Sequence, residues 1–341
     1  MTKTNDTTIE QLSKIIEAPK KKAKGKLAKL AQQAAPPIIP ATQEEARQNL
    51  RILVVTYEDL KEMSKKCKQR AGDYRDKNTG ELLRENRLPQ EARAALEEMA
   101  ELYDSKASSL KAHMRRQMKL FPIYTMWLRD VAGIGDCASA KLLADIDIKR
   151  ATKPSSLHQV CGLGVWVDEE GKGHAQRARA NEPLDFHNRL KVALSQAFGS
   201  LVKQKATRDE SIYYRRYVEY KNRLQTSGRF VLLDKTQKNP RTGEMERMAT
   251  FDGKPGGRAK TNDMAWRPAM QLFLDHLYLI WRSIEGLEVR CPYLFAKRGF
   301  DHQGAKIGNE WRKLTPEQAL AEVATGRSLS AATVAELSVA E

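Results

Sequence analysis

Residues 131–143 of the chain read VAGIGDCASAKLL, in which two glycines form a turn and a helix-forming run follows. Glycine has no Cβ atom, so the backbone of such a turn can be tight and its amides can approach an anion at the start of the helix. Asp136 suits the dipole at that helix start, but its charge competes with a bound anion. The pattern predicts a helix-hairpin-helix motif that contacts nucleic-acid phosphates without reading bases, through Gly133, Ile134, Gly135 and Lys141. The alternative is an ordinary tight turn that packs on neighbouring helices.

Upstream of this turn, apolar residues recur with heptad spacing, which favours long helices over residues 42–120. One row is Leu50, Leu53, Tyr57, Leu60 and Cys67, and a second row is Leu96, Met99, Tyr103 and Leu110. Gly80 and Pro89 lie between the rows and predict a break. We therefore expect an antiparallel helical hairpin, or a dimeric coiled coil that makes the chain a homo-oligomer. Residues 51–57 also fit a strand that ends near Asp59, but their flanks favour a helix.

Downstream of the turn, the pattern predicts a mainly α fold with a small β-hairpin. Pro240, Gly243 and Gly253 punctuate residues 225–262, where a hairpin is expected after Phe230. A helix is expected over residues 263–284, because its apolar residues share one face, namely Met270, Phe273, Leu274, Leu277 and Trp281. Thr315, before Pro316, is a predicted helix N-cap. The expected segments are a disordered basic arm (1–41), the helical hairpin or coiled coil (42–120), a helix-hairpin-helix unit (121–224), a basic loop, hairpin and helix (225–313) and an acidic tail (314–341).

The charge of the chain favours a polyanionic partner. Of its 341 residues, 59 are Lys or Arg and 43 are Asp or Glu, which gives a net charge of +16. Residues 201–313 and the arm 1–40 hold most of this excess, whereas the tail is acidic. Such asymmetry is typical of nucleic-acid binding, with a solubilising surface as the alternative. The sequence has neither an apolar window of membrane-span length nor a signal peptide, so no membrane partner and a cytoplasmic, nucleoid-associated location are expected.

Residues 121–224 as a whole resemble the C-terminal domain of bacterial insertion-sequence transposases, in the group that pairs a ribonuclease-H-like N-terminal domain with a helix-hairpin-helix domain and uses a bridge RNA. The resemblance rests on the Gly133–Gly135 turn, the helix end at residues 142–146, the Gly162-Leu163 step, the Arg189-Leu190 pair, and the series Ser211, Tyr214 and Tyr217. It implies a helix-hairpin-helix domain that binds DNA and possibly a guide RNA.

Two departures from that family remove both halves of its active site. Members carry an acidic tetrad in an N-terminal sheet that holds divalent metal, whereas residues 42–120 predict helices. Members also carry a nucleophilic serine after the Gly-Leu step, where this chain reads Asp168-Glu169-Glu170. No catalytic residue, no metal site and no cofactor are therefore predicted, and Mg²⁺ enters only if the chain is a diverged enzyme. Ser155 and Ser156 are expected to cap a helix.

Other candidate side chains have a functional and a structural interpretation. Four basic residues are expected to contact phosphates, namely Lys172, Arg177, Arg179 and Arg189. Three tyrosines either stack on bases or line the core, namely Tyr213, Tyr214 and Tyr217. Core packing is preferred to a zinc site for His158, Cys161, His174 and His187. Asp59, Asp104 and the acidic run 168–170 are expected to face water.

Three hypotheses follow from the sequence. The leading one is a nucleic-acid-binding protein derived from, or accessory to, an insertion-sequence transposase and inactive as an enzyme on its own. The second is a diverged DNA transposase or recombinase whose carboxylates are unrecognised. The third is a basic structural or assembly protein whose coiled coil drives association.

Overall fold

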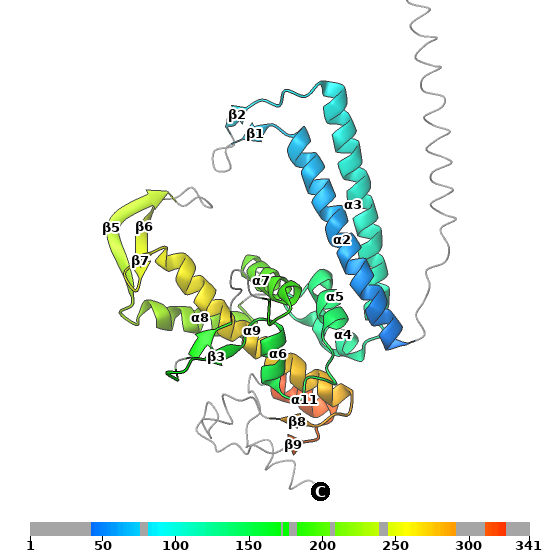
Figure 1. Cartoon of the computed structure of the whole chain (residues 1–341), viewed down its shortest axis with the longest axis vertical. Coiled ribbons are helices and arrows are strands. Elements are labelled where there is room, and N and C mark those ends of the chain that lie inside the picture. Colours follow the sequence, from blue (N-terminus) through cyan, green and yellow to red (C-terminus); the bar gives the residue numbers. More distant parts are fainter. Residues whose placement is uncertain are drawn as a thin grey trace, which may run out of the picture. The chain divides into compact units, whose positions relative to one another are not determined.

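The computed structural model describes residues 42–75, 81–171, 173–176, 183–204, 209–238, 245–290 and 311–324. These residues form a mainly helical fold with short antiparallel strands, which confirms the expected fold class (Figure 1). The Lys-rich arm predicted to be disordered and most of the acidic tail lie outside the described residues. None of the described helices combines the length and the apolar composition that a membrane span requires.

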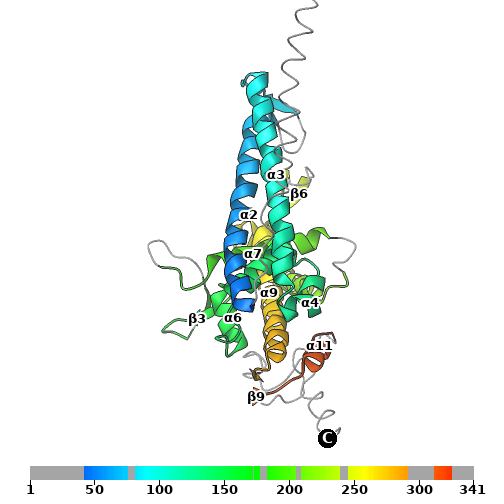
Figure 2. The same cartoon turned by 90° about the vertical axis from the view of Figure 1, so that its right-hand side faces the viewer.

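The segment predicted to be a hairpin or coiled coil is an antiparallel helical hairpin. Helix α2 (Gln43–Ala71) and helix α3 (Gln90–Met118) lie side by side, with the short strands β1 (Tyr74–Arg75) and β2 (Leu82–Arg84) near their connection (Figure 2). Thr42 caps α2, because its hydroxyl accepts from the amide of Glu45 while the Glu45 carboxylate accepts from the amide of Thr42. Residues 51–57 are helical, so the alternative of a strand ending near Asp59 is wrong and the preferred helix is confirmed.

Small side chains let the two long helices approach each other. Ala100 and Ala107 of α3 are buried along with Ser64 and Cys67 of α2. Asp104 bridges the helices, because its carboxylate accepts hydrogen bonds from Lys61 (2.8 Å) and Lys68 (2.6 Å). Asp104 is thus a partly exposed charge that also joins the two helices, which the sequence did not predict, whereas Asp59 is exposed as expected.

A group of shorter helices follows the hairpin. It consists of α4 (Pro122–Met126), the 3₁₀ helix η1 (Leu128–Asp130), α5 (Asp136–Asp145), α6 (Pro154–Val160), the strand pair β3 (Val165–Val167) and β4 (Gly173–Ala175), and α7 (Asn188–Lys203). Helix α7 begins directly after His187, whose amide donates to the carbonyl oxygen of Val160 at 2.8 Å. Ser155 and Ser156 lie in the first turn of α6, whose N-cap is Lys153 instead.

The C-terminal half contains the expected hairpin and long helix. Helix α8 (Ile212–Gln225) leads into a sheet in which β6 (Met245–Phe251) lies between β5 (Phe230–Lys238) and β7 (Lys254–Pro255). Helix α9 (Gly257–Ile284) begins earlier than predicted, after Gly256 in the left-handed conformation. A Cβ atom on Gly257 would lie 2.5 Å from the carbonyl oxygen of Thr250, so this start needs glycine. The strands β8 (Val289–Arg290) and β9 (Trp311–Arg312) precede α11 (Pro316–Ala324), which Thr315 caps as predicted.

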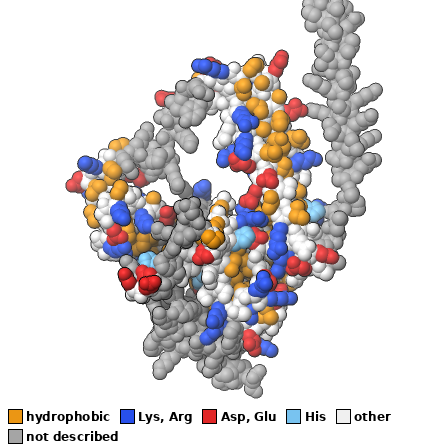
Figure 3. All heavy atoms as spheres, in the orientation of Figure 1, with side chains coloured by type: hydrophobic (Ala, Val, Ile, Leu, Met, Phe, Trp, Pro, Cys, Tyr) orange, Lys and Arg blue, Asp and Glu red, His pale blue; other side chains and the backbone are white. Residues whose placement is uncertain are grey.

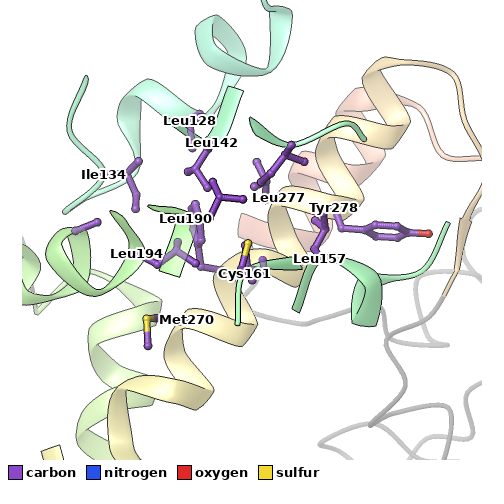
Figure 4. Packing of buried hydrophobic residues seen from close by; sticks show 14 of the residues in the cluster. Leu128, Ile134, Leu142, Leu157, Cys161, Leu190, Leu194, Met270, Leu277 and Tyr278 are labelled. Atoms are coloured by element: carbon purple, nitrogen blue, oxygen red, sulfur yellow. The ribbon is translucent and has the colours of Figure 1, made fainter. Parts of the chain in front are cut away.

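Helix α9 is the centre of the core. Its predicted apolar face is buried, and so are the residues around it, because α4, α6, α7, α8, α11 and β6 all contact it. Leu277 lies on the side of Leu142 and Leu190, and Tyr278 lies beside Leu157 of α6 (Figure 4). Buried apolar residues from Ala46 to Val323 form one contiguous cluster. The segments predicted to end at 120 and 224 therefore share a core.

Candidate nucleic-acid interface

The glycine turn joins η1 to α5, as the sequence pattern predicts, but its two glycines differ in role. Gly133 has φ +86°, and a Cβ atom there would lie 2.7 Å from the Cβ of Leu201 and 3.2 Å from the carbonyl oxygen of Ala197 on α7. Ile134 is buried in the core beside it (Figure 4). Close packing on α7 therefore explains why residue 133 is a glycine, in agreement with the alternative of a tight turn that packs on neighbouring helices. The buried side chain of Ile134 holds the turn in the core.

Gly135 is the exposed residue of the turn. It is the N-cap of α5 with φ −81° and ψ 172°, and an added Cβ atom would meet nothing within 4 Å. The backbone at the start of α5 is thus open to an incoming group, in the position that the phosphate-contact interpretation needs.

The carboxylate of Asp136 points back toward α3 and is neutralised there. Arg115 lies 2.7 Å and Lys111 3.3 Å from it, and the Tyr124 hydroxyl donates to its second oxygen at 3.3 Å. Burial alone would raise the pKa of Asp136, but the hydrogen bonds from Arg115 and Lys111 outweigh it and hold the pKa below its usual value. This arrangement removes the competition that a free Asp136 would offer to an anion at Gly135.

A groove of about 680 Å³ runs along the exposed side of the turn. Residues 131–135 form one wall and residues 210–213, at the start of α8, form another. Arg129 at its rim is held by Asp130 through bonds of 2.9 and 3.2 Å. The lining of the groove is more apolar than polar, and its charged residues are one base, Arg129, and two acids, Asp130 and Glu210. Cations that attract a polyanion must therefore come from neighbouring elements.

The prediction that Lys141 contacts phosphates is wrong. Its side chain is only 2% exposed, and its ammonium forms an ion pair with Glu58 of α2. Helix α2 packs across α5 and covers this face. Burying an amine requires such a partner, and no local pattern indicates that Glu58, 83 positions earlier in the chain, supplies it.

Of the four other basic residues predicted to contact phosphates, the structure describes only Arg189. Arg189, in the first turn of α7, is partly exposed and lies 3.7 Å from Asp145, which also has Arg51 at 3.9 Å and His187 at 3.8 Å. The side chain of Asp145 is only 6% exposed and has the guanidinium groups of Arg51 and Arg189 beside it, so Arg189 is first a local ion-pair partner. The remaining predicted residues lie outside the described part of the chain, namely Lys172, Arg177 and Arg179.

The tyrosines of α8 serve mainly the core. Tyr213 is 5% exposed, its hydroxyl lies 2.9 Å from Nδ1 of His276, and burial raises its pKa. Tyr217 is buried and stacks on Trp266 with ring centroids 3.8 Å apart. Tyr214 is half-buried and packs on the same cluster. Stacking of bases on Tyr213 or Tyr217 is therefore excluded in this arrangement, and the core interpretation of these two residues is correct.

The sequence showed an excess of charge in this part of the chain, and the structure shows which side chains carry it. Residues 212–260 contain twelve Lys or Arg and five Asp or Glu. Arg229, Arg247 and Arg258 are paired with acids of the sheet. In the described residues, six further bases have no carboxylate within ion-pair distance, and we call them the ribbon surface: Arg215, Lys221, Arg223, Lys235, Lys254 and Lys260. Burial and the nearby Arg258 lower the pKa of Lys221, as expected where cations crowd together.

The acidic run and the predicted zinc alternatives do not converge. Asp168 lies 2.5 Å from Nε2 of His174 across the β3–β4 turn, so it does not simply face water, whereas Glu169 and Glu170 are exposed as expected. His158 pairs with Asp275 at 3.0 Å, and Cys161 is buried in the core. Within the described ranges, no group of three or more His, Cys, Asp or Glu side chains is placed to hold a metal ion.

Comparison with protein-family models, with curated proteins and with solved structures found no match to this chain. The resemblance to insertion-sequence transposases therefore rests on the quoted residues alone and stays a hypothesis.

Proposed function

We propose that this chain is a nucleic-acid-binding protein that holds the sugar–phosphate backbone of duplex DNA through the ribbon surface and the open Gly135 turn. The observation that carries the proposal is the ribbon surface itself, a set of six exposed or half-exposed bases that have no carboxylate of the described residues within ion-pair distance. Asp252, which interacts with Lys254 and Lys260 at longer range, is itself paired with Arg229. Unpaired Lys and Arg side chains in such a concentration release counterions when they meet phosphates, which favours binding to any sequence.

Helix α8 links the two parts of this interface. It begins at the groove beside the turn, where Ser211 and Ile212 line the wall, and it ends before β5. Its apolar side is anchored in the core by Tyr213 and Tyr217, which leaves Arg215 on the exposed side. A backbone that contacts the turn can thus continue along α8 to the sheet.

The β5–β6 ribbon suits a groove of DNA. Its two strands pair in register at their base and again near their tip, with an irregularity between Leu232 and Thr236 that bends the ribbon. Val231, Leu232 and Met245 are exposed on it. The major groove of B-DNA admits a two-stranded ribbon, with basic side chains reaching the phosphates on either side.

The proposal includes descent from, or association with, an insertion-sequence transposase, and binding without strand cleavage by this chain alone. Its support is the helical hairpin at 43–118, where the family has its catalytic sheet, and the separate positions of Asp59, Asp104 and the 168–170 run. Contact with a guide RNA belongs to the same proposal, since phosphates of either polymer satisfy the ribbon surface.

The test is a salt titration of binding to a fluorescent 30-base-pair duplex, with the triple variant Lys221→Glu, Lys254→Glu and Lys260→Glu. Loss of three phosphate contacts should reduce the slope of log K against log salt by about 3 and weaken low-salt affinity at least about tenfold. The control variant is Lys149→Glu, Lys153→Glu and Lys313→Glu, which makes the same charge change at exposed lysines elsewhere. Equal losses in both variants, or an affinity that salt does not change, would refute the proposal. Single-stranded DNA and RNA competitors identify the preferred polymer.

A further inference from the structure

We propose that two copies of this chain associate through the α2–α3 hairpin, with the two-fold axis running along the hairpin. The proposal does not rest on nucleic-acid binding. Beyond the seam where its two helices meet, the hairpin has two long sides. Helix α5 packs on one of them, and large apolar side chains are exposed on the other.

The covered side packs on α5. Arg51 of α2 donates to the carbonyl oxygen of Ala144 at 2.9 Å, and Arg115 of α3 lies 2.7 Å from the carboxylate of Asp136. The ion pair of Glu58 with the buried lysine of α5 lies on this side as well. Both helices thus use polar side chains to hold the rest of the fold.

The opposite side carries large apolar side chains. Ile52 and Met63 of α2 are 67% and 48% exposed, and Met99 and Leu102 of α3 are 43% and 55% exposed. Ile52 and Met63 are three helical turns apart and Met99 and Leu102 one turn apart, so each helix presents a row. Figure 3 shows hydrophobic side chains gathered along the hairpin.

Helix geometry places both rows on the same side. On each helix we take the direction of the residues that fill the seam as the reference. A rotation about the helix axis of roughly 90–140° leads from this direction to the exposed apolar residues, in the same rotational sense on both helices. Because the helices are antiparallel, the same sense brings them to the same side of the hairpin. Arg51, Glu58 and Arg115 are turned in the opposite sense, toward α5, which agrees with their contacts.

The charges that border these rows indicate that the occupant is a second copy. Asp59 and Arg70 border the row of α2, and Glu98 and Lys106 border the row of α3; all four are exposed, with no oppositely charged partner in the described residues. The hydrogen bonds from Lys61 and Lys68 of α2 to Asp104 of α3 show which residues of the two helices lie at the same height along the hairpin. By that register, Arg70 lies level with Glu98, and Asp59 lies within a helical turn of Lys106.

A two-fold axis along the hairpin places α2 of one copy opposite α3 of the other at the same level. Arg70 then meets Glu98 of the second copy, Asp59 lies within a helical turn of Lys106, and Met63 lies within a helical turn of Leu102, whereas Ile52 lies nearer the open end of the hairpin, beyond the level of Met99 and Leu102. Each pair occurs twice by symmetry. The result is a four-helix bundle in which neighbouring helices are antiparallel, an arrangement that buries such rows in general.

Sedimentation velocity on the full chain tests the association. A dimer of the 38.6 kDa chain is expected at micromolar concentration. The variant Met63→Glu with Leu102→Glu should raise the dimer dissociation constant on the order of 100-fold, because charges replace buried apolar area. Val192→Glu, at a comparably exposed position on α7, should leave it unchanged. A wild-type chain that stays monomeric at tens of micromolar would overturn the proposal.

Charge exchange tests the axis. Glu98→Lys with Lys106→Glu reverses the α3 border, and Asp59→Lys with Arg70→Glu reverses the α2 border, both without changing net charge. Each variant alone should dimerise at least about tenfold more weakly, and an equimolar mixture should form heterodimers with restored affinity. Circular dichroism confirms that each variant is folded. Undiminished dimers of either variant, or no recovery on mixing, would refute an axis that pairs α2 with α3.

Discussion

The two glycines of the turn should respond differently to substitution, and this difference separates packing from binding. Gly133→Ala places a Cβ atom at φ +86°, which costs about 1–2 kcal/mol for a residue other than glycine. The same atom would lie 2.7 Å from the Cβ of Leu201 and 3.2 Å from the carbonyl oxygen of Ala197, so the turn must move away from α7. Overpacking of this kind costs about 1–3 kcal/mol, and the expected loss in unfolding free energy is about 2–5 kcal/mol in total.

Gly135→Ala is the matched control. Its φ of −81° suits any residue and its Cβ atom would meet nothing within 4 Å, so only the preference of an N-cap for glycine over alanine is lost, at less than about 1 kcal/mol. Urea unfolding followed by circular dichroism measures both variants against the wild type. Equal midpoints for the two variants would refute the packing role of Gly133.

For DNA binding, substitution of Gly135 should have the larger effect and substitution of Gly133 the smaller one, the reverse of their effects on stability. Gly135→Val adds bulk at the open start of α5 and should weaken DNA binding at least about tenfold while the chain stays folded, because it blocks backbone approach. Folded Gly133→Ala protein should keep its affinity. If Gly135→Val binds as the wild type does, the turn contributes only to packing.

Three further predictions concern buried and acidic groups. Glu58→Met should destabilise the chain by about 3–5 kcal/mol in thermal unfolding, because it leaves the buried ammonium of Lys141 without its partner, whereas replacing both residues with Met should recover much of that loss. Burial lowers the pKa of His276 to about 4, so as the pH falls the unfolded chain takes up a proton at this residue before the folded chain does. The free energy of unfolding should therefore fall by about 1.4 kcal/mol per pH unit from about pH 6.5 down to about pH 4. His276→Gln should flatten this part of a stability–pH curve, and an unchanged slope would contradict the assignment. Purified protein with Mg²⁺ or Mn²⁺ should leave supercoiled plasmid intact, and nicking that alanine substitution of residues 168–170 abolishes would favour the enzyme hypothesis instead.

Local signals in the sequence predicted the elements well where the structure is decided locally. Thr42 and Thr315 cap their helices through side chain to backbone bonds within one turn, which a short stretch of sequence specifies. The start of α9 was predicted too late, because the close approach of Gly257 to Thr250 is a contact between separate elements. Periodicity shows that a face is apolar, and it does not show which residues of a chain will cover it.

The candidate site was harder to predict for the same reason. Gly133 and Gly135 look equivalent in sequence, but only the position of α7 makes the first a packing residue. Lys141 follows the turn at a spacing that suits an exposed helix face, and α2 buries that face. The charge excess was visible from composition, whereas the assignment of unpaired bases required knowing which arginines the sheet carboxylates hold.

The tyrosines of α8 connect the stability of the core with the proposed interface. Tyr217 stacks on Trp266 and its hydroxyl donates to Asn262, so α8 is fixed against α9 in one rotational setting. That setting decides which side chains of α8 are presented to solvent, and it leaves Arg215 and Arg223 on the exposed side. The two sequence interpretations of this segment, core tyrosines and basic surface, are thus compatible, because the aromatic residues position the arginines. A polyanion held by these arginines would contact a rigid helix whose geometry is set by the core.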